Sequence, residues 1–251
     1  MQYFNPHEIK IENKEEIKKQ LQNHIGKNLR NFFALNLTSN HILQSNWDKN
    51  CNILDIGPAS GNFAQQLNKK GYKNVYGIDI DNYLSLQNKP LLKEFKTADL
   101  SFDKTPWPDN SFKVVTAWCV LPHLENPFHC VRETHRVLEP NGLFIFSVPN
   151  ILSKASISYF TNMRDFGSYK ESNNHLVIFT QNIIKKAILK YFEVIAIEYH
   201  IRDKVFSNNL KGKLRKLIYD IAGKISIKIK KELEKRWAYN AIYILRKKSE
   251  M

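Results

Sequence analysis

The stretch NILDIGPASGNF, residues 52–63, constrains the fold of this chain more than any other. The apolar residues before Gly57 predict a buried strand. Gly57 and Gly61 predict a tight turn, and the apolar spacing that follows predicts a helix ending at Gly71. Strand, glycine turn and helix together make a ligand seat, because glycines let the backbone approach closely and a helix start offers free N–H groups. The alternative is an ordinary turn between a strand and a helix.

An acid at the end of the next predicted strand supports the ligand seat. Residues 75–80 are predicted as the next strand, and Asp79 lies at its end. It follows the glycine turn by about twenty residues, the spacing at which such an acid binds both hydroxyls of a ribose. An ordinary acid at the start of a loop is the alternative. The two features together favour a nucleoside-type ligand.

These residues resemble a known family. The segments LDIG (54–57), Gly61 and GID (77–79) are similar to the first two motifs of class I S-adenosylmethionine-dependent methyltransferases. Further similar segments follow in the family's order up to about residue 150: TADL (97–100), PWPDNSFKVV (106–115), VLPHLENP (120–127), RVLEPNG (136–142) and SVPN (147–150). The resemblance is to the small-molecule branch, which includes quinone-biosynthesis and glycan-modifying enzymes. It implies a Rossmann-like, doubly wound, mostly parallel seven-stranded sheet with helices on both faces and an antiparallel last strand.

The apolar pattern independently predicts a parallel sheet, because strands and helices alternate from Cys51 onward. Predicted strands are 52–56, 74–79, 94–98, 112–118, 142–148, 192–199 and 239–245. Predicted helices are 61–70, 82–89, 127–138 and one that Thr180 caps. The segment 151–178 has no regular pattern, and such loops often carry specificity residues. Ligands of such sheets bind beyond the carboxyl ends of strands, where the sequence has Asp55, Asp79, Asp99 and Trp118.

The resemblance implies S-adenosylmethionine as the cofactor. The implied binding residues are Asp55, Gly57, Pro58, Ala59, Ser60, Gly61, Asp79, Ile80, Asp99, Leu100, Trp118 and Cys119. The glycine turn is expected at the amino-acid end, where Asp55 either orders the turn or reaches the amino group, and Asp79 is expected at the ribose. Ala59 departs from the family, which most often has glycine there, and its methyl group is tolerated if φ is negative.

The other half of the implied site lies on later strands. Ile80 and Leu100 suit the two faces of the adenine, and Asp99 suits its exocyclic amine. Trp118 and Cys119 follow the fourth strand and are expected beside the sulfonium and its methyl group.

Two histidines are candidates for catalysis. Methyl transfer depends mostly on positioning, but a hydroxyl acceptor benefits from a base within hydrogen-bond reach. His123 and His175 fit that role because imidazole titrates near neutral pH. A capping or packing role is the alternative for His123, and His175 lies in the irregular segment. His129 and His135 are expected to pack or to lie on the surface. No His, Cys or Asp spacing indicates a metal.

The predicted function is methyl transfer to a hydroxyl, or as a second choice an amine, of a small molecule, a glycan or a lipid-linked acceptor. An RNA methyltransferase that uses a basic insertion and a non-catalytic cofactor-binding adaptor are the alternatives. Nucleic acid is the less favoured partner, because the Asn/Asp-Pro-Pro-Tyr motif of amino-methylating enzymes and the Pro-Cys nucleophile of cytosine-C5 enzymes are absent.

The pattern divides the chain into an N-terminal helical extension (1–45), the cofactor-binding core (46–202), a basic amphipathic helical insertion (203–237) and the final strand of the core (238–251). The net charge of +14 favours anionic partners. We expect a cytoplasmic protein, because the three cysteines show no pattern and the sequence shows neither a signal peptide nor an apolar run of membrane-spanning length. The insertion is expected to contact the inner face of a membrane, to pack on the core or to face RNA.

Overall fold

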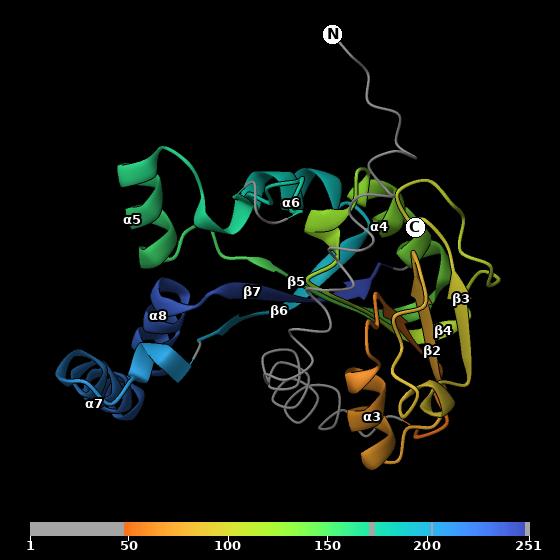
Figure 1. The fold of residues 1–251 in the computed structure, drawn as a ribbon, viewed down its shortest axis with the longest axis horizontal. Coiled ribbons are helices and arrows are strands. Elements are labelled where there is room, and N and C mark those ends of the chain that lie inside the picture. The colour runs from red at the N-terminus through yellow and green to blue at the C-terminus, as the bar shows by residue number, and fades with distance from the viewer. Residues whose placement is uncertain (1–47, 171–173, 202, 249–251) are drawn as a thin grey trace, which may run out of the picture. The chain divides into compact units, whose positions relative to one another are not determined.

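The structure, a computed structural model, describes residues 48–170, 174–201 and 203–248 (Figure 1). The predicted N-terminal helical extension therefore lies outside the described residues. The chain forms two compact units, of which the first ends at Ala98 and the second begins at Asp99. Each unit is a set of strands with its own helices.

Seven strands of the described residues form one sheet in the order β3-β2-β1-β4-β5-β7-β6. Their bounds are β1 Ile53–Ile56, β2 Val75–Asp79, β3 Glu94–Thr97, β4 Phe112–Trp118, β5 Leu138–Pro149, β6 Phe192–His200 and β7 Asn240–Lys247. Within the first unit β1, β2 and β3 pair in parallel. Within the second unit β4 and β5 pair in parallel, and β7 runs antiparallel between β5 and β6. The predicted Rossmann-like sheet with an antiparallel last strand is confirmed, and β5 begins earlier than expected.

The first unit holds one α-helix within its described residues, α3 (Asn62–Lys69), which ends as predicted ahead of Gly71 at φ +92°. The helix predicted over 82–89 is wrong. Only a short 3₁₀ helix, η2 (Lys89–Leu91), follows that stretch. The side chain of Asn82 accepts from the Leu84 N–H, and the side chain of Ser85 accepts from the Asn88 N–H. Such local side-chain hydrogen bonds compete with helix formation.

The second unit carries the remaining described helices. They are η3 (Leu121–His123), α4 (Pro127–Val137), α5 (Lys154–Met163), η4 (Gly167–Tyr169), α6 (Gln181–Ala187), η5 (Asp203–Phe206), α7 (Leu210–Ile225) and α8 (Ile227–Trp237). Thr180 caps α6 as predicted, since its side chain accepts from the Ile183 N–H at 3.2 Å. The expectation that 151–178 is irregular is wrong for α5, which Ser153 caps. No residue of α5 is buried, so no apolar periodicity marks it in the sequence.

Aromatic side chains fill the core of the second unit. Phe144 of β5 lies 5.0 Å from Phe146 and 5.5 Å from Phe192 of β6 between ring centroids. Phe146 in turn stacks on Tyr243 of β7 at 5.1 Å. These contacts join the antiparallel strands, which are adjacent in space but distant in sequence, to the parallel part of the unit.

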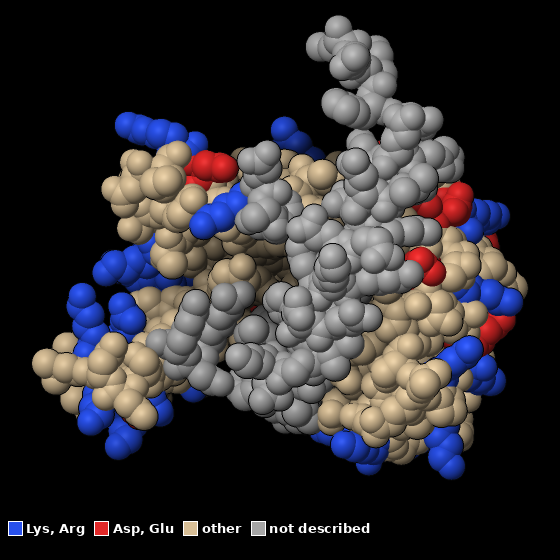
Figure 2. All heavy atoms as spheres, viewed as in Figure 1, with Lys and Arg blue, Asp and Glu red and all other residues tan. Residues whose placement is uncertain are grey.

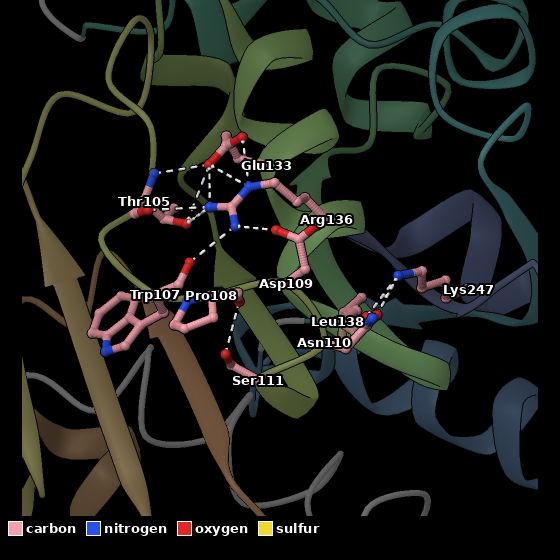
Figure 3. Close-up of polar contacts among 10 residues, drawn as sticks. All are labelled: Thr105, Trp107, Pro108, Asp109, Asn110, Ser111, Glu133, Arg136, Leu138 and Lys247. Atoms are coloured by element: carbon pink, nitrogen blue, oxygen red, sulfur yellow. Dashed lines mark hydrogen bonds and ion pairs between the residues drawn. The ribbon is translucent and has the colours of Figure 1, made fainter.

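An ion pair between Arg136 and the buried Glu133 holds the loop before β4 (Figure 3). The Arg136 guanidinium of α4 donates to the Glu133 carboxylate at 2.8 Å, to the Asp109 carboxylate at 2.8 Å and to the Trp107 carbonyl at 2.9 Å. It also donates to Oγ1 of Thr105, and the Thr105 N–H donates to Glu133. The PWPDNSF segment therefore fastens the strand to the end of α4.

Candidate active site

The glycine turn follows β1 and contains three residues with positive φ. Gly57 has φ +66°, Ala59 has φ +49° and Gly61 has φ +80°. The condition under which the Ala59 methyl group would be tolerated is not met: its backbone adopts the left-handed conformation, which is unfavourable for a residue with a Cβ atom. Backbone strain of this kind persists where the surrounding contacts fix the conformation, and strained residues are concentrated at functional sites.

The turn is bound to the strand-end acid. The Gly57 N–H donates to the Ile78 carbonyl at 2.8 Å. Oδ1 of Asp79 accepts from the Ile80 N–H at 2.8 Å, and its Oδ2 accepts from the Ala59 N–H at 3.4 Å. The first unit therefore brings the glycine turn and Asp79 together, as the ligand-seat hypothesis requires. Pro58 is buried and so is Asp55 at the end of β1, whereas Ile80 is exposed.

Gly77 allows the turn to pack closely on β2. A Cβ atom there would lie 2.5 Å from Leu92, 3.1 Å from Phe95 and 3.2 Å from Pro58 of the turn. Gly77 is also the register partner of Asp55. A side chain at position 77 would therefore displace Leu92 and crowd Pro58 of the turn.

Sequence reasoning missed the loop that supports the turn. The Ser60 carbonyl accepts from Oγ of Ser85 at 3.2 Å and from Nδ2 of Asn88 at 2.9 Å. Asn88 also donates to the side chain of Asn62 at the start of α3. Nothing in a polar loop sequence marks these two residues, because the hydrogen bonds form only when the loop returns to the turn.

Tyr83 of the same loop presents a buried hydroxyl near Asp79. Burial, and then the negative charges of Asp79 and Asp81, raise its pKa to about 12, so the hydroxyl stays protonated. Within the described residues this buried hydroxyl has no hydrogen-bond partner. Buried polar groups are normally paired, so a protonated donor beside a carboxylate fits a polar ligand such as a nucleoside.

In the second unit, the turn after β3 is ordered by its own side chains. Oδ1 of Asp99 accepts from the Ser101 N–H at 3.1 Å, while the Asp99 N–H donates to Asp103 at 2.8 Å. The Leu100 side chain is buried. The expected adenine contacts of Asp99 and Leu100 remain predictions.

Trp118 is half-buried at the end of β4, and Cys119 directly follows it with φ +55°. The Cys119 N–H donates to Oγ of Ser147 at 3.0 Å. Nδ2 of the buried Asn240 donates to Sγ of Cys119 at 3.2 Å. Strands β5 and β7 thus hold Cys119 in an unfavourable backbone conformation at the carboxyl end of β4.

The two candidate histidines lie next to each other, although 51 residues separate them in the sequence. The ring centroids of His123 and His175 are 4.4 Å apart. Nδ1 of His123 donates to the Asn174 carbonyl at 3.1 Å, and Nδ1 of His175 donates to the Ser168 carbonyl. A ring held in this way carries its lone pair on Nε2 whenever it is neutral.

The surroundings keep His175 neutral. Burial lowers its pKa below the usual 6.5, and the hydrogen bond to Ser168 opposes this only in part. Tyr169, whose ring centroid is 5.3 Å from that of His175, has its pKa raised to about 12 by burial. The arrangement places a neutral imidazole beside a protonated phenol, which suits the acceptance of a proton.

The other histidines of interest pack as expected. Nε2 of His129 donates to the Asp103 carbonyl at 3.0 Å, and the His135 ring contacts Tyr191 and Phe192. Within the described ranges, no group of three or more His, Cys, Asp or Glu residues could hold a metal ion.

The fold and the first unit's site define a Rossmann-like class I methyltransferase architecture. The strand order, the antiparallel β7 and the glycine turn bound to a strand-end acid are the features that carry this assignment. The fit of Asp79 and Tyr83 to a nucleoside agrees with it.

Comparisons with known proteins give the family. Residues 54–146 match the family described as "Methyltransferase domain". A ubiquinone/menaquinone biosynthesis C-methyltransferase from Rickettsia akari is 33% identical over 133 residues, which cover 48% of this chain and 52% of that protein. A sterol 24-C-methyltransferase from Gibberella zeae is 31% identical over 98 residues, 37% of this chain and 26% of that protein. The chain spans about half of the length of the ubiquinone/menaquinone C-methyltransferases that it matches, or less than half.

A solved structure supports the fold. The structure of a SAM-dependent methyltransferase from Archaeoglobus fulgidus superposes with a TM-score of 0.58 at 18% identity, covering 92% of this chain and 99% of that one. Residues 54–146 therefore match a methyltransferase domain, and the chain has the fold of that S-adenosylmethionine-dependent methyltransferase. The cofactor that this family implies is S-adenosylmethionine.

Proposed function

We propose that this protein transfers a methyl group from S-adenosylmethionine to a hydroxyl group of a small molecule, a glycan or a lipid-linked acceptor, with an amine as the second choice. The observation that carries the proposal is the His123–His175 pair, in which burial keeps His175 neutral. The methyltransferase domain that residues 54–146 match supports the methyl-transfer part.

The first unit would hold the cofactor. The glycine turn presents backbone N–H groups, the Asp79 carboxylate accepts hydrogen bonds from a ribose diol, and the Tyr83 hydroxyl donates one. S-adenosylmethionine, when bound, supplies a methyl group that its positive sulfur already activates. The chain therefore has to position the acceptor and remove a proton from it.

His175 is the proposed base. Its Nδ1–H is fixed by the Ser168 carbonyl, so Nε2 takes the proton of the acceptor hydroxyl and the acceptor oxygen becomes the nucleophile. His123 acts as a positioning residue through its ring contact and its bond to Asn174. Two adjacent rings resist double protonation, so the pair carries one proton at a time after the transfer.

A carbon acceptor is a further candidate, because two relatives are named C-methyltransferases. A base that deprotonates a phenolic hydroxyl also activates the neighbouring ring carbon as a nucleophile. His175 starts either outcome by taking the hydroxyl proton. On the carbon path the proton of the methylated ring carbon must then also leave, and the phenolic oxygen takes a proton back. The position of the new methyl group in the product distinguishes the two.

Transfer of labelled methyl groups tests the proposal. Purified protein is incubated with methyl-labelled S-adenosylmethionine and a cell extract, which is then fractionated into small molecules, glycan, lipid and RNA. Label in one of the first three fractions, lost in His175→Ala and kept in the control His129→Ala, supports it. NMR of the product shows whether oxygen or carbon is methylated.

Three results would overturn the proposal. Label that enters RNA alone indicates an RNA methyltransferase. Cofactor binding by calorimetry without transfer into any fraction indicates an adaptor. Equal transfer by His175→Ala and the wild type removes His175 as the base.

A further inference from the structure

Helix α7 packs on the protein with a face that is not its apolar face. Gly212 and Ala222 are buried and Tyr219 is half-buried. At about 100° per residue these positions share one side of the helix. The Leu and Ile side chains occupy the adjoining arc of about 100° and are 42–85% exposed. This apolar stripe consists of Leu210, Leu214, Leu217, Ile218, Ile221 and Ile225.

The contacts of the packing face fix this orientation within the second unit. A Cβ atom on Gly212 would lie 2.0 Å from the Ser207 carbonyl oxygen, so that turn of the helix lies directly on the preceding loop. The Tyr219 hydroxyl donates to Glu234 of α8 at 2.6 Å. The ring of Phe206 lies 5.4 Å from that of Tyr219. These contacts leave the stripe facing outward.

Helix α8 is in turn fastened to the strands. Nδ2 of Asn150, directly after β5, donates to the carbonyls of Lys235 at 2.7 Å and Ala238 at 3.2 Å. The ring of Trp237 lies 6.3 Å from that of Phe206. These contacts fix the helix pair to the rest of the second unit (Figure 1), and the predicted helical insertion forms two helices, α7 and α8.

The stripe is surrounded by positive charge. Residues 210–237 contain ten Lys and Arg residues and three Asp and Glu residues, an excess of seven, which is half of the chain's net charge of +14. At helical spacing, Lys213 and Lys224 lie along one border of the stripe and Lys211 along the other. Figure 2 shows blue side chains around tan surface at this position. Lys216, away from the stripe, pairs with Asp220 at 2.7 Å.

We infer that the apolar stripe of α7 and the basic residues beside it dock this protein on an anionic lipid bilayer. An outward apolar arc bordered by lysines is the arrangement of a helix that lies in the membrane interface. The lysines meet acidic headgroups while the Leu and Ile side chains enter the acyl boundary. The expectation that the stripe packs on the core is wrong, given its exposure in the described residues.

Other occupants fit less well. An RNA surface uses basic residues with stacking aromatics and does not require six exposed aliphatic side chains. A second copy would bring two surfaces with the same positive excess together. Within the described ranges no helix is long and apolar enough to cross a bilayer, so the docking is to one surface. The inference is independent of the proposed methyl transfer.

Vesicle flotation of the full chain tests the inference. Wild-type protein is expected to float with vesicles of phosphatidylcholine and phosphatidylglycerol and to stay behind with phosphatidylcholine alone. Raising NaCl from about 0.1 M to about 1 M shortens the Debye length from about 10 Å to about 3 Å and should release most of the bound protein.

Two pairs of variants separate the stripe from the charge. Leu214→Gln/Leu217→Gln/Ile221→Gln should lose binding, whereas Leu86→Gln, at a residue 93% exposed outside α7, should keep it. A charge reversal of Lys213 and Lys224 should also lose binding. The same reversal of Lys185 and Lys186, exposed on α6, should keep it. Circular dichroism checks that each variant is folded.

Four outcomes would overturn the inference. These are wild-type protein that stays in solution with anionic vesicles at low salt, equal flotation with neutral and anionic vesicles, and unchanged flotation of the triple variant. The fourth is a dimer in sedimentation, or an RNA complex in a mobility shift, that the variants abolish while vesicles bind nothing.

Discussion

Replacing Arg136 with methionine should destabilise the protein strongly, because it removes the cation from a buried carboxylate. The side chains of Arg136 and Glu133 are 17% and 11% exposed. Arg136 also donates to Asp109 and to the Trp107 and Thr105 carbonyls (Figure 3). Methionine keeps the unbranched stem of the side chain but has no guanidinium and makes none of these hydrogen bonds.

Breaking a buried pair by removing one partner costs about 3–5 kcal/mol. At about 2–4 °C per kcal/mol for a domain of this size, the thermal midpoint should fall by roughly 6–20 °C. The double variant Arg136→Met/Glu133→Gln should be more stable than Arg136→Met, because it no longer buries an uncompensated charge.

The loss depends on pH. Burial raises the pKa of Glu133, but the hydrogen bonds from Arg136 and Thr105 outweigh it, and the net pKa lies below the usual 4.5. In the wild type this carboxylate therefore stabilises the fold above pH 4.5, and the stabilisation is lost as the pH falls. Without Arg136, only the hydrogen bonds from Thr105 still oppose the effect of burial, so the pKa of Glu133 rises relative to the wild type and the variant loses part of this stabilisation above pH 4.5. The difference between the two proteins should grow from acid to neutral pH.

Urea and thermal unfolding followed by circular dichroism, at acid and neutral pH, measure both effects. A loss under about 1 kcal/mol at neutral pH would place Arg136 among ordinary surface substitutions and refute the argument. So would a double variant that is no more stable than Arg136→Met.

Three further predictions concern the site. Asp79→Ala should weaken S-adenosylmethionine binding by about 1–3 kcal/mol in calorimetry, through lost charge-assisted hydrogen bonds, and unchanged affinity in a folded variant would remove Asp79 from the ribose site. Because the pKa of His175 lies below 6.5, kcat/KM should fall only at a pH under 6.5, and any stability gained from the neutral ring should be lost over the same range. His175→Ala should lower turnover and remove this fall of kcat/KM at acid pH while leaving cofactor affinity nearly intact. A variant in which the fall at acid pH persists would contradict the assignment. Ala59→Gly should stabilise the fold by up to about 1 kcal/mol, since glycine suits φ +49°, and a less stable variant would be evidence against a strained turn.

Local patterns were sufficient for the sheet and for half of the candidate site. Apolar and alternating runs predicted the seven strands of the described residues, and continuous apolar runs mark strands such as β1 and β7, whose residues are almost all buried. The glycine turn and Asp79 belong to one strand–helix–strand unit, whose geometry is set by short-range connections. Asp79 could therefore be placed at the turn before the fold was seen.

Side-chain hydrogen bonds in loops were beyond the reach of these patterns. Asn82, Ser85 and Asn88 stand at helical spacing over 82–89, yet they hold a loop against the glycine turn instead of forming a helix. Helix α5 was missed for the opposite reason, since it buries no residue and so has no apolar period. Hydrophobic periodicity reports burial, and it fails where hydrogen bonds alone decide the structure.

The sequence by itself determined the class of fold, the glycine turn with its strand-end acid, and a basic amphipathic segment at 203–237. Only the tertiary structure brought His123 beside His175, because their contact depends on the return of the 174–177 segment to the carbonyl of Pro122. Only the tertiary structure also turned the α7 stripe outward. An amphipathic pattern fixes which side chains share a helix face, but the contacts of Gly212 and Tyr219 decide where that face points.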